Sequence, residues 1–569
     1  MRVVLTQCLK LSKNMETQRL VALFVFFFSG FLLWTAWQKQ HTPLPAPTAA
    51  TQPGGANTVP VPTSSNGAAS SSTPATTISA APASGQLLRG ERIRVATDLI
   101  VAEIDTNGGD LRQIELIKHK ASENKTHNLI LFNDNTPQIY VAQSGLIGVG
   151  LPNHKSLFKA DAGRYELQQG NDSIIVKLFS QAEDGANVVK QYTFHRSTYV
   201  IDITFEIENK GAAAITADAY FQFLRFGEAP STNPFGISTF VGPAIYTEEK
   251  KFQKIGFPDI DKGKLEYPQK SKDGWLAMLQ HYFVAAWLPK NGVEREFFTK
   301  KVAEKLYTAG VVVAVGQIAP DTTGRVSVPL YVGPQEGDNL AKLAPGLDLT
   351  IDYGWLTIIA SPLFKVLSYI HSWLGNWGLA IIALTVLIKL LFFPLSAASY
   401  KSMAKMKVLG PKLQKLKEQY GEDKQKMNQA MMELYKTEKV NPLGGCLPIV
   451  IQIPVFISLY WVLLAAVELR HAPFFGWIKD LSAADPFYIL PVLMGATMFL
   501  QTKLNPTPPD PIQAKIMLYM PLVFSVMFLW FPAGLVLYWT VNNLLSIWQQ
   551  WQINRLTEQA ALPKGSGKR

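Results

Sequence analysis

Residues 516–554 read IMLYMPLVFSVMFLWFPAGLVLYWTVNNLLSIWQQWQIN, a run of 39 residues without a charged side chain. At about 1.5 Å per residue, one helix of this length would be roughly twice as long as the hydrocarbon core of a bilayer is thick. The segment 531–534, Phe-Pro-Ala-Gly, favours a turn near the middle. We therefore predict two membrane helices, at 516–531 and 535–554, joined by a tight hairpin.

Three further apolar runs precede this hairpin. Those at 373–395, 443–467 and 486–501 predict three more membrane helices, and the first is interrupted only by Lys389. Before them, residues 353–372 mix tryptophan, leucine and isoleucine with a lysine and a histidine. This mixture is typical of a helix that lies in the membrane interface.

A sixth apolar run lies near the amino end, at 20–37. Its 18 residues are enough for an anchor helix, and two tryptophans close to its end are typical of an interfacial belt. A cleaved signal peptide is the alternative, but the run is longer than usual and lacks a convincing cleavage site. The charged side chains within residues 1–19 are mainly basic and predict a cytoplasmic amino end. Met15 is an alternative start of the chain.

A soluble domain separates the anchor from the other spans. Residues 38–90 are rich in proline, alanine, serine and threonine and predict a flexible linker. Residues 91–350 contain several β-branched runs between turn signals, and apolar residues alternate with mainly polar ones over 199–208. We predict a large antiparallel β-sandwich with little helix.

The charge distribution predicts the orientation. Between Lys401 and Lys439 there are ten lysines against five acidic residues, so the helical hairpin expected at 396–442 should be cytoplasmic. The basic tail at 555–569 then also lies in the cytoplasm, whereas 91–350 lies outside. The lysines that we predict to dock cytoplasmic partners are Lys401, Lys405, Lys407, Lys412, Lys415 and Lys417.

Composition excludes several classes of protein. Of the 569 residues, 17% are charged, against roughly 25% in soluble domains. Two cysteines exclude a disulfide framework. Neither a phosphate-binding loop nor a metal-ligand spacing occurs, so the sequence predicts no cofactor, no metal and no nucleotide-driven pump. The excess positive charge, +11 in total, lies beside the predicted spans. This placement favours a role in orienting the chain in the membrane and in attracting anionic phospholipids or RNA-rich partners.

Lys389 is the strongest candidate for a functional residue. A charge at this depth costs at least about 2.5 kcal/mol, so it usually faces water or a partner. The alternative is that its four-carbon stem carries the ammonium to the cytoplasmic headgroups. Thr385 lies one turn earlier on the same face. Because the predicted spans offer no acidic partner, we expect the binding partner of this cation to be a carboxylate on another molecule.

Several motifs in the second half point to one family. They are NPLGGC at 441–446, VELRHAPF at 467–474, DLSAADPFYILPVLMGATMFLQ at 480–501 and FPAGLVLYWTVNNLLSIWQQ at 531–550. The chain resembles the YidC family of membrane protein insertases from Gram-negative bacteria, which has mitochondrial and chloroplast relatives. The resemblance covers essentially the whole chain and is most specific in the helices.

This resemblance implies a fold and a function. The expected fold is six membrane helices, five of them forming the insertase core, and a periplasmic β-supersandwich similar to galactose mutarotases. Members are not enzymes; they insert and help to fold inner-membrane proteins through a hydrated, positively charged groove. The implied partners are nascent membrane proteins, the Sec translocon, the ribosome and the signal recognition particle pathway, with no specific nucleic-acid sequence.

The resemblance also assigns residues. Lys389 becomes the groove cation, and Thr385, Gln452, Tyr538 and Trp539 become candidates for the groove or for the surface along which substrate helices slide. Gram-negative members commonly have arginine where this chain has Lys389. Because lysine lacks the planar fork of arginine, a point charge in a wet groove is retained while a bidentate contact is not.

Two rival functions are distinguishable. The histidines His119, His154, His195 and His281 leave room for a carbohydrate-active site in a sandwich that the helices merely anchor. Six spans with a buried lysine are more than an anchor needs. A small-solute transporter would carry paired intramembrane charges and inverted repeats, which the sequence does not offer.

Overall fold

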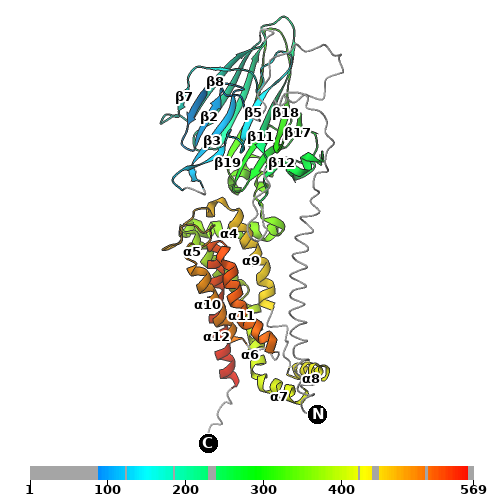
Figure 1. The fold of residues 1–569 in the computed structure, drawn as a ribbon, viewed down its shortest axis with the longest axis vertical. Coiled ribbons are helices and arrows are strands. Elements are labelled where there is room, and N and C mark those ends of the chain that lie inside the picture. Colours follow the sequence, from blue (N-terminus) through cyan, green and yellow to red (C-terminus); the bar gives the residue numbers. More distant parts are fainter. Residues whose placement is uncertain are drawn as a thin grey trace.

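The computed structural model describes residues 87–121, 125–182, 186–227, 239–264, 266–420, 423–438, 447–505 and 511–561. A β-sandwich is followed by a helical region, and the two parts are stacked end to end (Figure 1). The anchor predicted at 20–37, most of the linker at 38–90, the 441–446 motif and the end of the basic tail lie outside the described residues.

The sandwich consists of two sheets. One has the order β14-β17-β18-β11-β5-β3-β2-β1-β7, with β4 on β3, and the other has the order β13-β12-β15-β16-β19-β10-β9-β8-β6. Neighbouring strands are antiparallel except for β1 and β7. The strands of the first sheet are β1 (Arg92–Ala96), β2 (Ile100–Asp105), β3 (Asp110–Lys120), β4 (Asn128–Phe132), β5 (Tyr140–Ile147), β7 (Arg164–Glu166), β11 (Ile215–Phe226), β14 (Lys270–Ser271), β17 (Arg295–Ala303) and β18 (Leu306–Ile318). Those of the second are β6 (Lys159–Ala160), β8 (Ser173–Gln181), β9 (Asn187–His195), β10 (Val200–Glu208), β12 (Gly242–Thr247), β13 (Lys251–Lys254), β15 (Trp275–Gln280), β16 (Phe283–Trp287) and β19 (Thr323–Pro334).

Strand β10 explains why this part folds as a sandwich. Its alternating residues Ile201, Ile203, Phe205 and Ile207 are fully buried. Side chains of one parity point to one face of a sheet, so this face packs against the opposite sheet. The predicted antiparallel sandwich is confirmed, and the only helices among its described residues are α2 (Phe257–Asp261) and α3 (Gly337–Leu343), with the 3₁₀ turns η1 (Leu347–Thr350) and η2 (Gly354–Leu356) beyond them.

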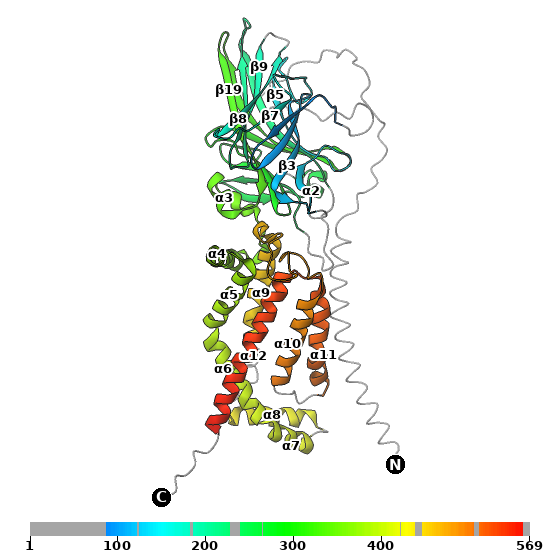
Figure 2. The same ribbon diagram turned by 90° about the vertical axis from the view of Figure 1, so that its left-hand side faces the viewer.

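The helical region contains nine α-helices among the described residues. Helices α7 and α8 lie at the end remote from the sandwich (Figure 2), and α12 packs against α5, α6, α9 and α10. The helices are α4 (Thr357–Leu374), α5 (Trp377–Leu391), α6 (Phe393–Val408), α7 (Gly410–Tyr420), α8 (Lys424–Thr437), α9 (Leu447–Ala465), α10 (Ile489–Leu504), α11 (Pro511–Met527) and α12 (Ala533–Ala561), with the 3₁₀ turns η4 (Val467–Leu469) and η5 (Phe528–Trp530).

The described helices do not confirm the predicted number of spans. None of them is by itself long and apolar enough to cross a bilayer; α5 and α6 meet that length and composition only together, and they are bent by 68°. Shorter apolar helices cover 451–465, 489–504 and 514–530. The predicted hairpin turn near 531–534 coincides with the start of α12 at Ala533.

The run at 373–395 forms parts of three helices instead of one. Gly375 ends α4 in the left-handed conformation (φ 65°), and the Asn376 side chain accepts a hydrogen bond from the Leu379 amide at 3.1 Å, which starts α5. A second break lies at Phe392, because Pro394 in the first turn of α6 lacks the amide that would continue α5. Trp373 therefore belongs to α4.

Helix α4 covers most of the predicted interfacial segment. Trp355, Ile358, Tyr369 and Trp373, in or just before it, are highly exposed, while Ala360 and Leu367 are fully buried. One apolar face therefore points away from the protein, as expected for a helix in contact with lipid. Helix α4 lies at the end of the helical region that faces the sandwich (Figure 2).

The sandwich and the helices share a hydrophobic core. Val467, just after α9, packs into the main core of the sandwich, and Tyr246, Trp275 and Leu279 of the second sheet belong to the core cluster of the helices. Arg470 donates a hydrogen bond to the backbone oxygen of Lys120 at 2.6 Å. The two parts are therefore docked through a specific junction.

Candidate functional site

Lys389 lies in α5, and its side chain is only 8% exposed. Its Nζ donates a hydrogen bond to Ser546 Oγ at 2.7 Å. Ser546 lies on α12 and is 2% exposed. Within the described part of the chain, no carboxylate lies within ion-pair distance of Lys389. The predicted cation is thus buried against a neutral hydroxyl.

Helix α12 turns a polar face toward the interior of the helical region. Asn543 Nδ2 donates to Thr497 Oγ1 of α10 at 3.3 Å, and Gln550 Nε2 donates to Asn505 Oδ1 at 3.1 Å. Gln549 Oε1 and Gln550 Oε1 are buried without a partner among the described residues. Buried amide oxygens of this kind are commonly satisfied by water or a ligand. The buried polar residues of this helix are Thr540, Asn542, Asn543, Ser546, Gln549 and Gln550.

The other predicted groove residues form a second group. Gln452 of α9 donates a hydrogen bond to the hydroxyl of Tyr538, which is fully buried. The indole of Trp539 packs edge-on against Phe456 at 4.7 Å between centroids, and its Nε1 is buried without a partner in the described structure. Tyr538 precedes Ser546 by eight residues, or roughly 12 Å of helix. The two groups therefore lie two turns apart along α12.

The hydroxyl of Thr385 forms no hydrogen bond with Lys389 in the described structure. It is 1% exposed, and its hydroxyl donates to the backbone oxygen of Ile381 at 2.7 Å. Threonine commonly satisfies its hydroxyl in this way inside a helix. The wetting role that its position one turn before Lys389 predicted stays a prediction.

Sequence reasoning missed two residues of this site, Ser546 and Tyr400. Tyr400 of α6 is 5% exposed, and its side chain lies near that of Ser546. A signal for Ser546 was present, since polar residues at 542, 543, 546, 549 and 550 recur at helical spacing within an uncharged run. Tyr400 gave no such signal, because its position depends on the bend between α5 and α6.

The basic residues predicted to dock partners line α6 and α7. Lys401, Lys405, Lys407 and Lys415 are exposed, as is Lys412, which pairs with Glu438 at the end of α8 at 2.5 Å. The side chain of Lys417 lies outside the described part. A row of exposed lysines on two helices is a basic surface suited to an anionic partner.

The four histidines predicted as candidates in the sandwich, His119, His154, His195 and His281, do not form one site. His154 hydrogen-bonds Tyr220 inside the sandwich, and His195 pairs with Asp202 at 2.8 Å near the surface. His119 and His281 lie at the junction with the helices, and neither joins a metal-binding cluster, of which the described residues contain none. Nothing in this arrangement resembles the convergent groups of a carbohydrate-active site.

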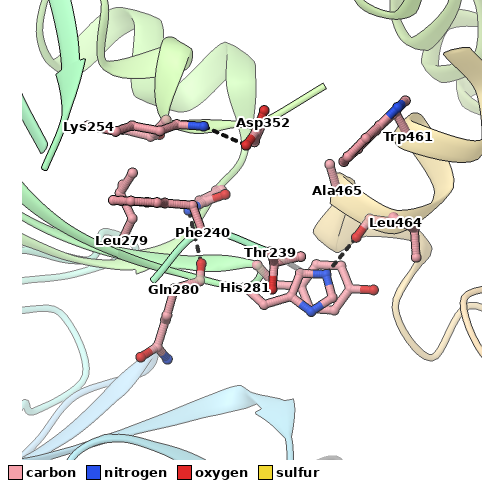
Figure 3. A pocket seen from close by; sticks show the side chains of 13 residues that line it. Thr239, Phe240, Lys254, Leu279, Gln280, His281, Asp352, Trp461, Leu464 and Ala465 are labelled. Carbon is pink, nitrogen blue, oxygen red and sulfur yellow. Dashed lines mark hydrogen bonds and ion pairs between the residues drawn. The ribbon is translucent and has the colours of Figure 1, made fainter. Parts of the chain in front are cut away.

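The junction has its own pocket, lined by both parts of the molecule. Figure 3 shows the ion pair of Lys254 and Asp352 on one side and His281 on the other. His281 Nε2 lies 2.7 Å from the backbone oxygen of Leu464 in α9. Burial lowers the pKa of His281, and it lowers that of His119 to about 4, with the cation of Arg470 acting in the same direction. Both rings are therefore neutral at pH 7, and His281 donates to the helix.

Comparison with known proteins covers nearly the whole chain. Residues 92–366 match the family described as "YidC periplasmic domain", and residues 369–560 match "60Kd inner membrane protein". A "Membrane protein insertase YidC" of Aromatoleum aromaticum is 56% identical over 545 residues, 96% of this chain and 98% of that protein. Its namesake from Nitrosomonas europaea is 53% identical over 559 residues, 95% of this chain and 91% of that protein.

A solved structure titled "Active YidC insertase crystal structure with the first transmembrane domain resolved" is 18% identical and covers 81% of this chain and 93% of its own, with a TM-score of 0.40. The relatives are named as insertases of membrane proteins, not as enzymes. From the identity over nearly full length and from both family matches, the chain belongs to the YidC family of membrane protein insertases.

Proposed function

We propose that this protein inserts inner-membrane proteins through the polar interior between α5, α6, α9 and α12. The observation that carries the proposal is Lys389, a lysine buried in an apolar helix with a neutral hydroxyl beside it. A buried cation without a carboxylate is costly. A carboxylate that arrives with the substrate and pairs with Lys389 would explain why this buried lysine is retained.

The polar face of α12 supports a hydrated groove. The buried atoms Ser458 Oγ, Trp539 Nε1 and Gln549 Oε1 have no protein partner in the described part. Water in such an interior would shorten the apolar barrier that a polar substrate segment has to cross. A segment that carries aspartate or glutamate would also be attracted by Lys389.

The energy for insertion comes from the substrate and the membrane. Lateral release of a helix of about twenty apolar residues into lipid buries its side chains in hydrocarbon. The membrane potential adds roughly 2.3 kcal/mol per charge and 100 mV for acidic segments that move outward. Nucleotide hydrolysis is not needed in this mechanism.

The position of α7 and α8 supports the proposed topology. These lysine-rich helices lie at the end opposite the sandwich (Figure 2), as expected when the sandwich is periplasmic and the lysines are cytoplasmic. Both termini would then be cytoplasmic. The row from Lys401 to Lys417 would contact the ribosome, the signal recognition particle pathway or anionic phospholipids, and the Sec translocon would deliver some substrates.

The test is insertion of a small single-span protein into liposomes that contain only this protein. Wild type is compared with Lys389→Ala and Lys389→Arg, and with Lys365→Ala, which removes an exposed lysine of α4. We expect insertion by wild type and by the Lys365 variant, retention in Lys389→Arg, and loss in Lys389→Ala. Absence of insertion by folded wild-type protein would overturn the proposal.

A further inference from the structure

The hydroxyl of Ser546 links α5 and α12 beside α6. It accepts a hydrogen bond from Lys389 of α5 at 2.7 Å and donates one to the backbone oxygen of Asn542 in its own helix at 2.8 Å. A serine hydroxyl has one donor and two acceptor positions. Since the bond to Asn542 uses the donor, Lys389 donates to Ser546, and the side chain of Tyr400 of α6 lies near the same hydroxyl.

The bend between α5 and α6 makes this convergence possible. Lys389 and Tyr400 are eleven residues apart, which would separate them by roughly 16 Å along one straight helix. The bend of 68° at Phe392 brings Lys389 to the hydroxyl of Ser546 and places the side chain of Tyr400 near it. The kink is therefore part of the geometry that surrounds the cation.

A lysine in this position has an alternative that the structure does not adopt. Its four-carbon stem is flexible, and a lysine near a helix end can extend its ammonium to the headgroups. Lys389 lies in the last turn of α5, just before the bend into α6, so such an escape would run along α6 toward the cytoplasmic side. The bond to Ser546 opposes it and leaves two of the three ammonium protons for another acceptor.

We propose that Ser546 is a positioning residue that holds the ammonium of Lys389 in the interior, where it receives the carboxylate of an acidic translocating segment. This inference rests on the proposed function, and it names the substrate class that depends on the hydroxyl: segments with aspartate or glutamate. The side chain of Tyr400 lies near Ser546 from α6. Neutral segments depend on the polar interior alone.

The experiment compares Ser546→Ala, Ser546→Thr and Tyr400→Phe in liposomes that contain the full chain. Two single-span substrates are used, which differ only by Asp→Asn exchanges in the translocated segment. Ser525→Ala is the matched control, because Ser525 of α11 also bonds a backbone oxygen between helices, that of Pro491 at 2.8 Å, far from Lys389 in sequence.

We expect Ser546→Ala to lower insertion of the acidic substrate about tenfold, the effect of losing one hydrogen bond to a charged group, and to change the neutral substrate less than twofold. Ser546→Thr keeps a hydroxyl at this position and should therefore keep insertion of the acidic substrate near the wild-type level. Tyr400→Phe should show a smaller loss in the same direction, and Ser525→Ala none. Equal losses for both substrates, or an unchanged ratio between them, would overturn the proposal.

A second measurement does not require insertion. The reaction of Lys389 with a water-soluble amine reagent, added from the cytoplasmic side and quantified by mass spectrometry, should rise several-fold in Ser546→Ala and stay low in Ser546→Thr. If wild type inserts neither substrate, the proposed function fails, while this reactivity still decides whether Ser546 holds the ammonium. Unchanged reactivity in Ser546→Ala would refute the positioning role.

Discussion

Acidification should destabilise the junction between the sandwich and the helices through His119. Its ring lies at the end of β3, edge-on to Phe283 with centroids 5.3 Å apart, and its Nε2 lies 3.3 Å from the Tyr199 hydroxyl. The basic residues that face it are Arg470 and His471, in the segment between α9 and α10, and Lys118 of its own strand. A proton on His119 would therefore be buried among positive charges.

The sign and size follow from the pKa, which burial lowers from 6.5 to about 4. Between these values the unfolded chain binds a proton that the folded chain does not, so stability is lost as the pH falls through this window. From pH 7.5 to pH 5 the full shift corresponds to about 2 kcal/mol. Because the ring is partly exposed, we expect ~1 kcal/mol, or roughly 2–4 °C in the melting temperature.

The assay is thermal unfolding of the full chain in nanodiscs at both pH values. His119→Gln should lose less stability on acidification than wild type, by about the amount given above. Ser525→Ala, which changes no titratable group, is the control and should keep the wild-type slope. Identical pH slopes for wild type and His119→Gln would refute the reasoning, because all other titrating groups are common to both.

Three further substitutions test the junction and the site. Glu468 is partly buried, and its Oε2 atom is buried without a partner in the described structure, which raises its pKa to about 7; its charged form therefore costs stability as the pH rises from 4.5 toward 7, and Glu468→Gln should raise the melting temperature at pH 8 but not at pH 4.5. Arg470→Ala removes the bond to Lys120 and the contact with Phe283, at a cost of about 2 kcal/mol, and should speed proteolysis between sandwich and helices; unchanged cleavage would contradict this. Tyr538→Phe removes the bond from Gln452 and should cost about 1 kcal/mol in thermal unfolding while sparing insertion; an insertion defect without a stability change would show that the hydroxyl serves the substrate directly.

Regular patterns were predictable from the sequence because they report local physics. The alternation over 199–208 predicted β10, since burial of one sheet face requires a period of two. The lone charge at 389 predicted a buried lysine, because a long apolar run leaves few other environments. The expectation of one helix at 373–395 failed, since counting apolar residues ignores the caps at Gly375 and Asn376.

Tertiary convergence could not be predicted in the same way. Arg470 meets the backbone of Lys120 across 350 positions, and Lys389 meets Ser546 across 157. Neither partner stands out by residue type, because a backbone oxygen and a serine occur everywhere. Such contacts depend on how whole elements pack, which no local window of sequence contains.

The place of Val467 in the core of the sandwich sets an order of events during biosynthesis. The last strand of the sandwich ends at Pro334, so 133 further residues must be made before Val467 exists. At about 5–20 residues per second this is a wait of roughly 7–27 s. Throughout that interval the sandwich lacks one of its own core side chains, and only the arrival of α9 completes it. The core of the sandwich is thus complete only after α9 has been made and has docked against it.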